Sequence, residues 1–85
     1  MNRKDRWKEA CIKRFMSNKM DLVDFGRLHA RLVRKRTAVH RMRDLLNTLG
    51  MLSPTHRVQL AVRSKELLDK IVGTERAVAY FAEQG

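Results

Sequence analysis

The sequence predicts an all-α fold, specifically a three-to-four-helix bundle with one long central basic amphipathic helix. Apolar residues recur at helical spacing through most of the 85 residues, and the chain holds only four Gly and one Pro. No run alternates apolar and polar residues as strands do, which argues against a sheet. A chain of this length can form one small core, so we expect a single domain over residues 1–85.

The first helix is expected over about residues 4–16. Its apolar face would carry Trp7, Cys11 and Phe15, which recur every fourth residue. The polar pair at residues 17–18 then favours a turn. An aromatic stripe at this spacing most often packs into a core, although an aromatic beside basic residues can also stack on single-stranded nucleic acid.

The second helix is expected to start near Asp21, a good N-cap, and to end at Gly50, which suits the C′ position. Residues 22–49 would span about 42 Å. That length predicts either a bend near Arg34–Arg36 or a projection that pairs with another chain. A heptad repeat broken only at Lys35 gives this helix its apolar residues, which are Phe25, Leu28, Leu32, Val39, Met42, Leu46 and Leu49.

The third helix is expected to start at Ser53-Pro54, since Ser is a common N-cap and Pro a common first helical residue. It should run to about Val72. Gly73-Thr74 is then expected to close it and to begin a short terminal helix. Two neighbouring sets of residues could form its buried face, either Val58, Ala61, Leu68 and Val72 or Leu60, Leu67 and Ile71.

The charge is strongly positive and unevenly spread. The chain has 19 Lys and Arg against nine Asp and Glu, a net charge of +10. No acidic residue lies between Asp24 and Asp44, although seven basic residues do. A solvated helix usually mixes both signs, because like charges such as Arg27 and Arg31 four residues apart repel. This pattern favours a polyanion or an acidic partner.

The basic residues of the second helix form two rows on a helical wheel. Arg27, Arg34 and Arg41 share one outer position, each about 10.5 Å from the next. A second row, with His29, Arg36 and Arg43, flanks the apolar seam. Each guanidinium can donate two parallel hydrogen bonds to a phosphate, so a row can follow a nucleic-acid backbone. A merely solvated cationic face is the alternative.

The expected nucleic-acid contacts come from all three helices. They are Arg27, Arg31, Arg34, Lys35, Arg36, Arg41 and Arg43 of the second helix, Lys4, Arg6, Lys13 and Arg14 of the first, and Arg57 and Arg63 of the third.

Residues 42–63 partly resemble a helix-turn-helix. The motif has an apolar-Gly turn followed by a helix that opens with small polar residues, as Leu49-Gly50 and Ser53-Pro54-Thr55 do here. The turn is one residue longer than the motif has, and His56 stands where an apolar anchor is usual. An ordinary helix-turn with a Ser-Pro cap is the alternative interpretation.

Two functions fit this sequence. The first is a small DNA- or RNA-binding protein that contacts mainly the phosphate backbone, and the helix-turn-helix likeness of residues 42–63 would fit a regulator. The second is a protein-binding module or inhibitor, of the kind found among phage and plasmid regulators, that docks on an acidic surface or a nucleoprotein complex. A parallel homodimer is poorly specified, because no acids flank the seam to pair with its bases. An antiparallel or end-to-end dimer is still compatible with the sequence.

Several other classes are not expected. The three His lie far apart along the chain, and no phosphate-binding or nucleophile motif is present, so we expect no metal, no cofactor and no enzyme activity. No apolar run approaches a membrane span or a secretory signal. Cys11 is the only cysteine, which suits a reducing compartment. We therefore expect a cytoplasmic protein, or one in a host cytoplasm.

Overall fold

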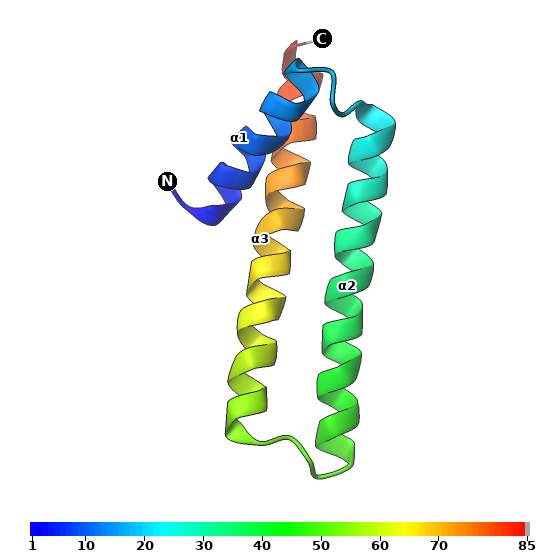
Figure 1. The fold of residues 1–85 in the computed structure, drawn as a ribbon, viewed down its shortest axis with the longest axis vertical. Coiled ribbons are helices and arrows are strands. Elements are labelled where there is room, and N and C mark those ends of the chain that lie inside the picture. Colours follow the sequence, from blue (N-terminus) through cyan, green and yellow to red (C-terminus); the bar gives the residue numbers. More distant parts are fainter. Residues whose placement is uncertain (85) are drawn as a thin grey trace.

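The computed structural model describes residues 1–84 and consists of three helices over that range, without strands (Figure 1). The helices are α1 (Arg3–Met16), α2 (Leu22–Thr48) and α3 (Pro54–Gln84). The predicted all-α class is confirmed. Helices α2 and α3 form an antiparallel hairpin, and α1 packs on the half of α3 that is remote from the α2–α3 turn (Figure 1).

The central position in this arrangement belongs to α3 and not to the basic helix α2. Helix α3 contacts both other helices, and α1 lies on the side of α3 away from most of α2 (Figure 1). The molecule measures 51 × 26 × 19 Å along its principal axes, so it is elongated along the hairpin. Among residues 1–84, no helix combines the length and the apolar character that crossing a membrane requires.

The helix starts follow the capping residues in the sequence. Asp21 forms a capping box with Asp24, in which the Asp24 backbone N–H donates to Asp21 Oδ1 at 2.9 Å and the Asp21 N–H donates to Asp24 Oδ2 at 3.1 Å. The His56 N–H donates to Ser53 Oγ at 3.1 Å, so Ser53 caps α3 as predicted. These bonds satisfy backbone donors that the first helical turn leaves without partners.

The ends of α1 and α2 share one geometry. The left-handed residue is Asn18 after α1 (φ 61°) and Gly50 after α2 (φ 66°). After α2, the Met51 N–H donates to the Leu46 carbonyl at 2.8 Å, as in a Schellman motif, and the Lys19 N–H does the same to Arg14 at 2.9 Å after α1. The predicted ends of both helices are thereby confirmed.

The predicted break at Gly73-Thr74 is wrong, because α3 continues through both residues to Gln84. Both are buried, and α1 crosses α3 there. A Cβ built on Gly73 would lie 2.7 Å from the Lys4 carbonyl oxygen and 2.9 Å from Trp7 Cβ. The glycine therefore permits a close helix–helix contact and does not end the helix.

The core is concentrated where all three helices meet. One buried cluster joins Cys11 of α1, Phe25 of α2 and Ala77 of α3, with Trp7 and Phe15 packed against it. This confirms the core role expected for the aromatic stripe of the first helix. A second cluster joins α2 to α3 through Leu32, Leu67 and Ile71. The buried face of α3 is thus the second of the two sets considered, since Val58 is 62% exposed.

The half of the hairpin nearest the turn has no comparable core. No residue between Val33 and Glu66 is fully buried. Met42 and Leu49, expected in the apolar seam, are 50% and 59% exposed. Helix α1 does not extend to this half, so α2 has only α3 as a neighbour there and buries a narrower face. We call this part of the hairpin, residues 34–65, the distal half.

Candidate nucleic-acid interface

Five of the expected contact residues on α2 form one exposed group, which we call the outer group. All five are exposed, and no carboxylate of residues 1–84 lies within ion-pairing distance of any of them. At about 100° of rotation per residue they fall within about 120° of one another around the helix axis, so they share one broad side of α2. The outer group is Arg27, Arg31, Arg34, Lys35 and Arg41.

The flanking row faces a different direction. Residues two positions apart on an α-helix lie about 200° apart around its axis, so Arg36 and Arg43 lie nearly opposite Arg34 and Arg41. They face the groove between α2 and α3. Further up the same row, His29 Nε2 lies 2.9 Å from Glu75 Oε1 of α3. The structure therefore gives the two rows of the helical wheel different surroundings, which are solvent for the first row and the α2–α3 groove for the second.

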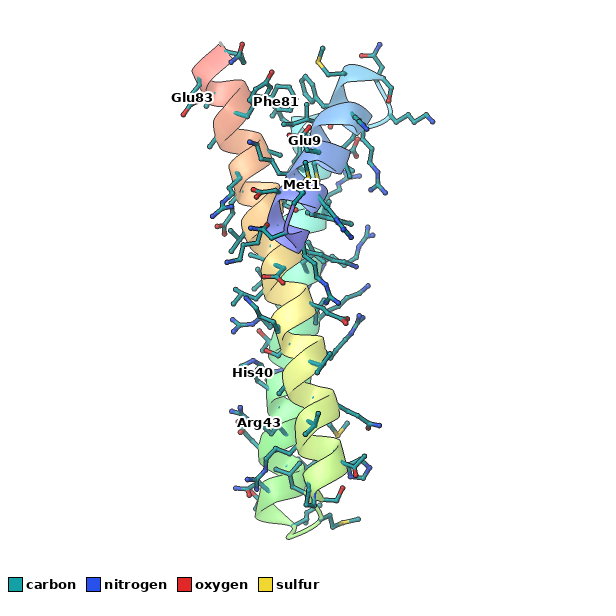
Figure 2. All side chains as sticks on the ribbon, turned by 90° about the vertical axis from the view of Figure 1, so that its left-hand side faces the viewer. Met1, Glu9, His40, Arg43, Phe81 and Glu83 are labelled. Carbon is teal, nitrogen blue, oxygen red and sulfur yellow. The ribbon has the colours of Figure 1, made fainter. Side chains whose placement is uncertain are left out.

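Basic side chains from α2 and α3 meet in the distal half. A groove of about 300 Å³ opens between the helices there, and Arg57 of α3 joins Arg36 and Arg43 at its edge. His40 and Arg43 project from the same side of the hairpin (Figure 2). We call the four cations that line this groove the groove cluster, which is Arg36 and Arg43 of α2 with Arg57 and Lys65 of α3.

Sequence reasoning missed three members of this groove. Lys65, His40 and Ser64 also line it, and His40 Nε2 lies 2.7 Å from Ser64 Oγ. The spacing of Arg57, Ser64 and Leu68 at intervals of seven and four residues places them on one face of α3. That spacing was available in the sequence, whereas the pairing of this face with α2 was not.

The basic residues of α1 form a separate group. Arg6, Lys13 and Arg14 are exposed, and Lys4 is half-buried beside Gly73. Helix α3 lies between most of α1 and α2, so this group does not extend the outer group (Figure 1). The structure thus divides the expected contacts between separate surfaces.

Trp7 is held in place by contacts within the chain. Its indole Nε1–H donates a 2.7 Å hydrogen bond to Thr74 Oγ1. Lys70 Nζ lies 5.0 Å from the ring centroid, and the Arg14 guanidinium lies 5.6 Å from it, both within cation–π range. These contacts favour a packing role for Trp7 over a base-stacking role.

The helix-turn-helix interpretation of residues 42–63 is not supported. In that motif the two helices meet at about 90–120°. Here the end of α2 and the start of α3 lie antiparallel and side by side (Figure 1). Arg63 makes an ion pair of 3.8 Å with Glu66 of its own helix, on a different face from the groove cluster. The segment is the closed end of a hairpin with a Ser-Pro cap.

An apolar strip lies next to the outer group. Met42, Leu45 and Leu49 are each at least half exposed. A shallow pocket of about 470 Å³ includes Met42 and Leu45, and Arg34 and Arg41 border it. The same side of α2 therefore offers positive charge and apolar surface together.

Among residues 1–84, no group of three or more His, Cys, Asp or Glu is placed to hold a metal ion. Burial raises the pKa of the Cys11 thiol, an effect that the Thr74 hydroxyl and the Arg14 charge only partly oppose. A thiol of this kind is a poor nucleophile at neutral pH. Comparison with models of protein families, with curated proteins and with solved structures gave no match.

Proposed function

We propose that this chain is a small nucleic-acid-binding protein that grips the phosphate backbone through the outer group of α2. The observation that carries the proposal is that five exposed cations lie on one side of one helix with no carboxylate partner in residues 1–84. Such cations repel one another, and a polyanion removes that cost.

This mode of binding is mainly electrostatic. Each phosphate contact releases condensed counterions, so the affinity falls steeply as salt rises. Backbone contacts also carry no direct sequence information. We therefore expect similar affinity for unrelated sequences of one nucleic-acid type, with DNA and RNA both able to offer the backbone that the outer group recognises.

Replacing Arg27, Arg34 and Arg41 together with Ala tests the proposal. The slope of log affinity against log salt should flatten by about two to three units, measured by fluorescence anisotropy with labelled DNA and RNA. The three positions are exposed, so the fold should persist in circular dichroism.

The matched control removes three arginines that do have partners. Arg3 and Arg63 pair with Glu66 at 3.2 and 3.8 Å, and Arg76 pairs with Asp5 at 3.2 Å. Changing these three to Ala alters the net charge equally but should alter the slope by less than about one unit. Equal effects of the two triple variants would show that only net charge matters and would contradict the assignment to the outer group.

A second function is favoured by the apolar strip beside the outer group. Phosphate contacts make no use of the exposed apolar side chains of Met42, Leu45 and Leu49. An acidic amphipathic helix would cover these side chains, and its carboxylates would meet Arg34 and Arg41. Under this alternative the chain is a protein-binding module that docks on an acidic partner.

The variant Leu45→Gln separates the two functions. It should leave the salt slope for nucleic acid unchanged, because it removes no charge. It should weaken capture of a stoichiometric protein partner from nuclease-treated lysate if the second function holds. Loss of nucleic-acid binding in Leu45→Gln would count against the backbone-only mode.

A further inference from the structure

The groove cluster carries an inference that goes beyond the outer group. The groove lies between α2 and α3 in the distal half, on the side of α2 nearly opposite Arg34 and Arg41. Its floor is apolar, and no carboxylate lines it. Six polar side chains do, namely Arg36, His40 and Arg43 of α2 and Arg57, Ser64 and Lys65 of α3.

The positive charge of this groove is only partly balanced inside the chain. Lys65 Nζ lies 3.1 Å from Asp69 Oδ1, and Arg43 lies 3.6 Å from the exposed carboxylate of Asp44. Arg36 and Arg57 have no ion pair with any carboxylate of residues 1–84. Four cations drawn from two helices therefore converge on one hollow with two acids beside them.

Arg36 provides the most specific observation. Its Nε atom is buried and has no hydrogen-bond partner within residues 1–84. Buried donors are nearly always satisfied, so such an atom calls for an explanation. The Nε–H and one terminal N–H of a guanidinium form a parallel pair of donors that matches two oxygens of a phosphate, so a rotation of this side chain toward the groove would give the buried Nε–H an acceptor.

We propose that the groove between α2 and α3 binds a phosphate group, with Arg36 as its central donor. Arg57 and Arg43 supply further charge from the two sides of the groove. The Ser64 hydroxyl and the His40 ring add polar groups, which already contact each other at 2.7 Å. The phosphate can belong to a nucleic-acid backbone or to a small phosphate compound, since both present the same oxygens.

The side chain of Arg36 itself reports on binding in the intact protein. We would titrate inorganic phosphate into the full chain and follow the arginine Nε–H resonances in ¹H–¹⁵N correlation spectra at constant ionic strength. The Arg36 resonance should shift and saturate, while that of Arg76, which pairs with Asp5 at 3.2 Å, should change little. Equal, unsaturated changes at both would show ionic screening only and would overturn the proposal.

Two variants test the geometry. Arg36→Lys keeps the charge but loses the paired donors, and it should weaken phosphate binding at least tenfold. The control Lys19→Gln removes an exposed charge from the turn between α1 and α2, at the end of the hairpin remote from the α2–α3 turn, and should change binding less than twofold (Figure 1). If Arg36→Lys loses helicity in circular dichroism, Arg57→Gln replaces it, with the same tenfold loss expected. Phosphate binding that survives Arg36→Lys, or Arg57→Gln in its place, would contradict the site.

A second titration identifies the source of the phosphate. If a short oligonucleotide shifts Arg36 and inorganic phosphate competes with it, the groove takes backbone phosphates. If only inorganic phosphate shifts Arg36, the groove takes a small phosphate compound. The variant in which Arg27, Arg34 and Arg41 are replaced with Ala leaves the groove intact, so the Arg36 resonance should still shift in that variant. Failure of the proposed function and failure of this site therefore give different results. No response of Arg36 to either ligand would overturn the site.

Discussion

Trp7 Nε1 donates a 2.7 Å hydrogen bond to Thr74 Oγ1, a contact between residues 67 positions apart that joins α1 to α3. The same Thr74 hydroxyl donates to the Lys70 carbonyl of its own helix at 2.9 Å. Thr74 is buried, so its hydroxyl has little access to water. This bond therefore helps to fix the orientation of α1 on the hairpin.

Thr74→Val should destabilise the protein by about 1–2 kcal/mol, because it keeps the side-chain shape but leaves the indole N–H without its acceptor. Urea unfolding followed by circular dichroism measures the change. The control is Thr37→Val, since Thr37 is exposed and bonds only within α2. In a Trp7→Phe background the Thr74→Val cost should shrink, and an undiminished cost would show that the two side chains are not coupled.

Gly73→Ala and Gly26→Ala should act in opposite directions. A Cβ at Gly73 would press on the backbone of Lys4 and on Trp7, so we expect a loss of about 1–3 kcal/mol in the free energy of unfolding. At Gly26 a Cβ meets nothing within 4 Å, so the better helix propensity of Ala should stabilise by up to about 1 kcal/mol. Thermal or urea unfolding measures the free energy of unfolding of both variants. Stabilisation by both changes would refute the close α1–α3 contact.

Cys11 should make stability depend on pH on the alkaline side. Burial raises the pKa of this thiol, so the folded chain keeps its proton at pH values where the unfolded chain releases it. The contribution is fully present below the ordinary thiol pKa and is lost as pH rises towards the folded-state pKa. Urea midpoints measured across that range should fall more steeply for the native chain than for Cys11→Ala. Parallel curves would contradict the prediction.

Backbone amides in the distal half should exchange with solvent faster than those near residues 67–77. The distal half contains no fully buried residue, whereas six residues in 67–77 are buried. Native-state hydrogen exchange by NMR measures the two opening free energies. Phosphate bound in the groove cluster should slow exchange in the distal half alone. Identical protection in both regions would indicate a single cooperative unit.

The helix boundaries could be predicted because capping is local. Asp21 contacts Asp24, Ser53 contacts His56, and Gly50 adopts a left-handed conformation, all within a few residues of one another. The failure at Gly73 has the opposite cause. A glycine beside a threonine is equally compatible with a helix end and with a close helix contact, and only the position of α1 distinguishes them.

The apolar seam of α2 was predicted only in part for a similar reason. Periodicity identified Phe25 and Leu32 correctly, and both are buried. It could not show that α1 stops short of the distal half, where Met42 and Leu49 are therefore exposed. The spacing of apolar residues describes one helix, whereas burial depends on how many neighbours that helix has.

The sequence by itself determined the helical class, most of the helix ends and the excess of cations on α2, because these depend on residue type and local spacing. Only the tertiary structure decided which cations face solvent and which share a groove. Arg34 and Arg36 are two residues apart, yet one belongs to the outer group and the other to the groove cluster. Positions two apart on a helix point in nearly opposite directions, and the neighbouring helix α3 faces only the side that carries Arg36.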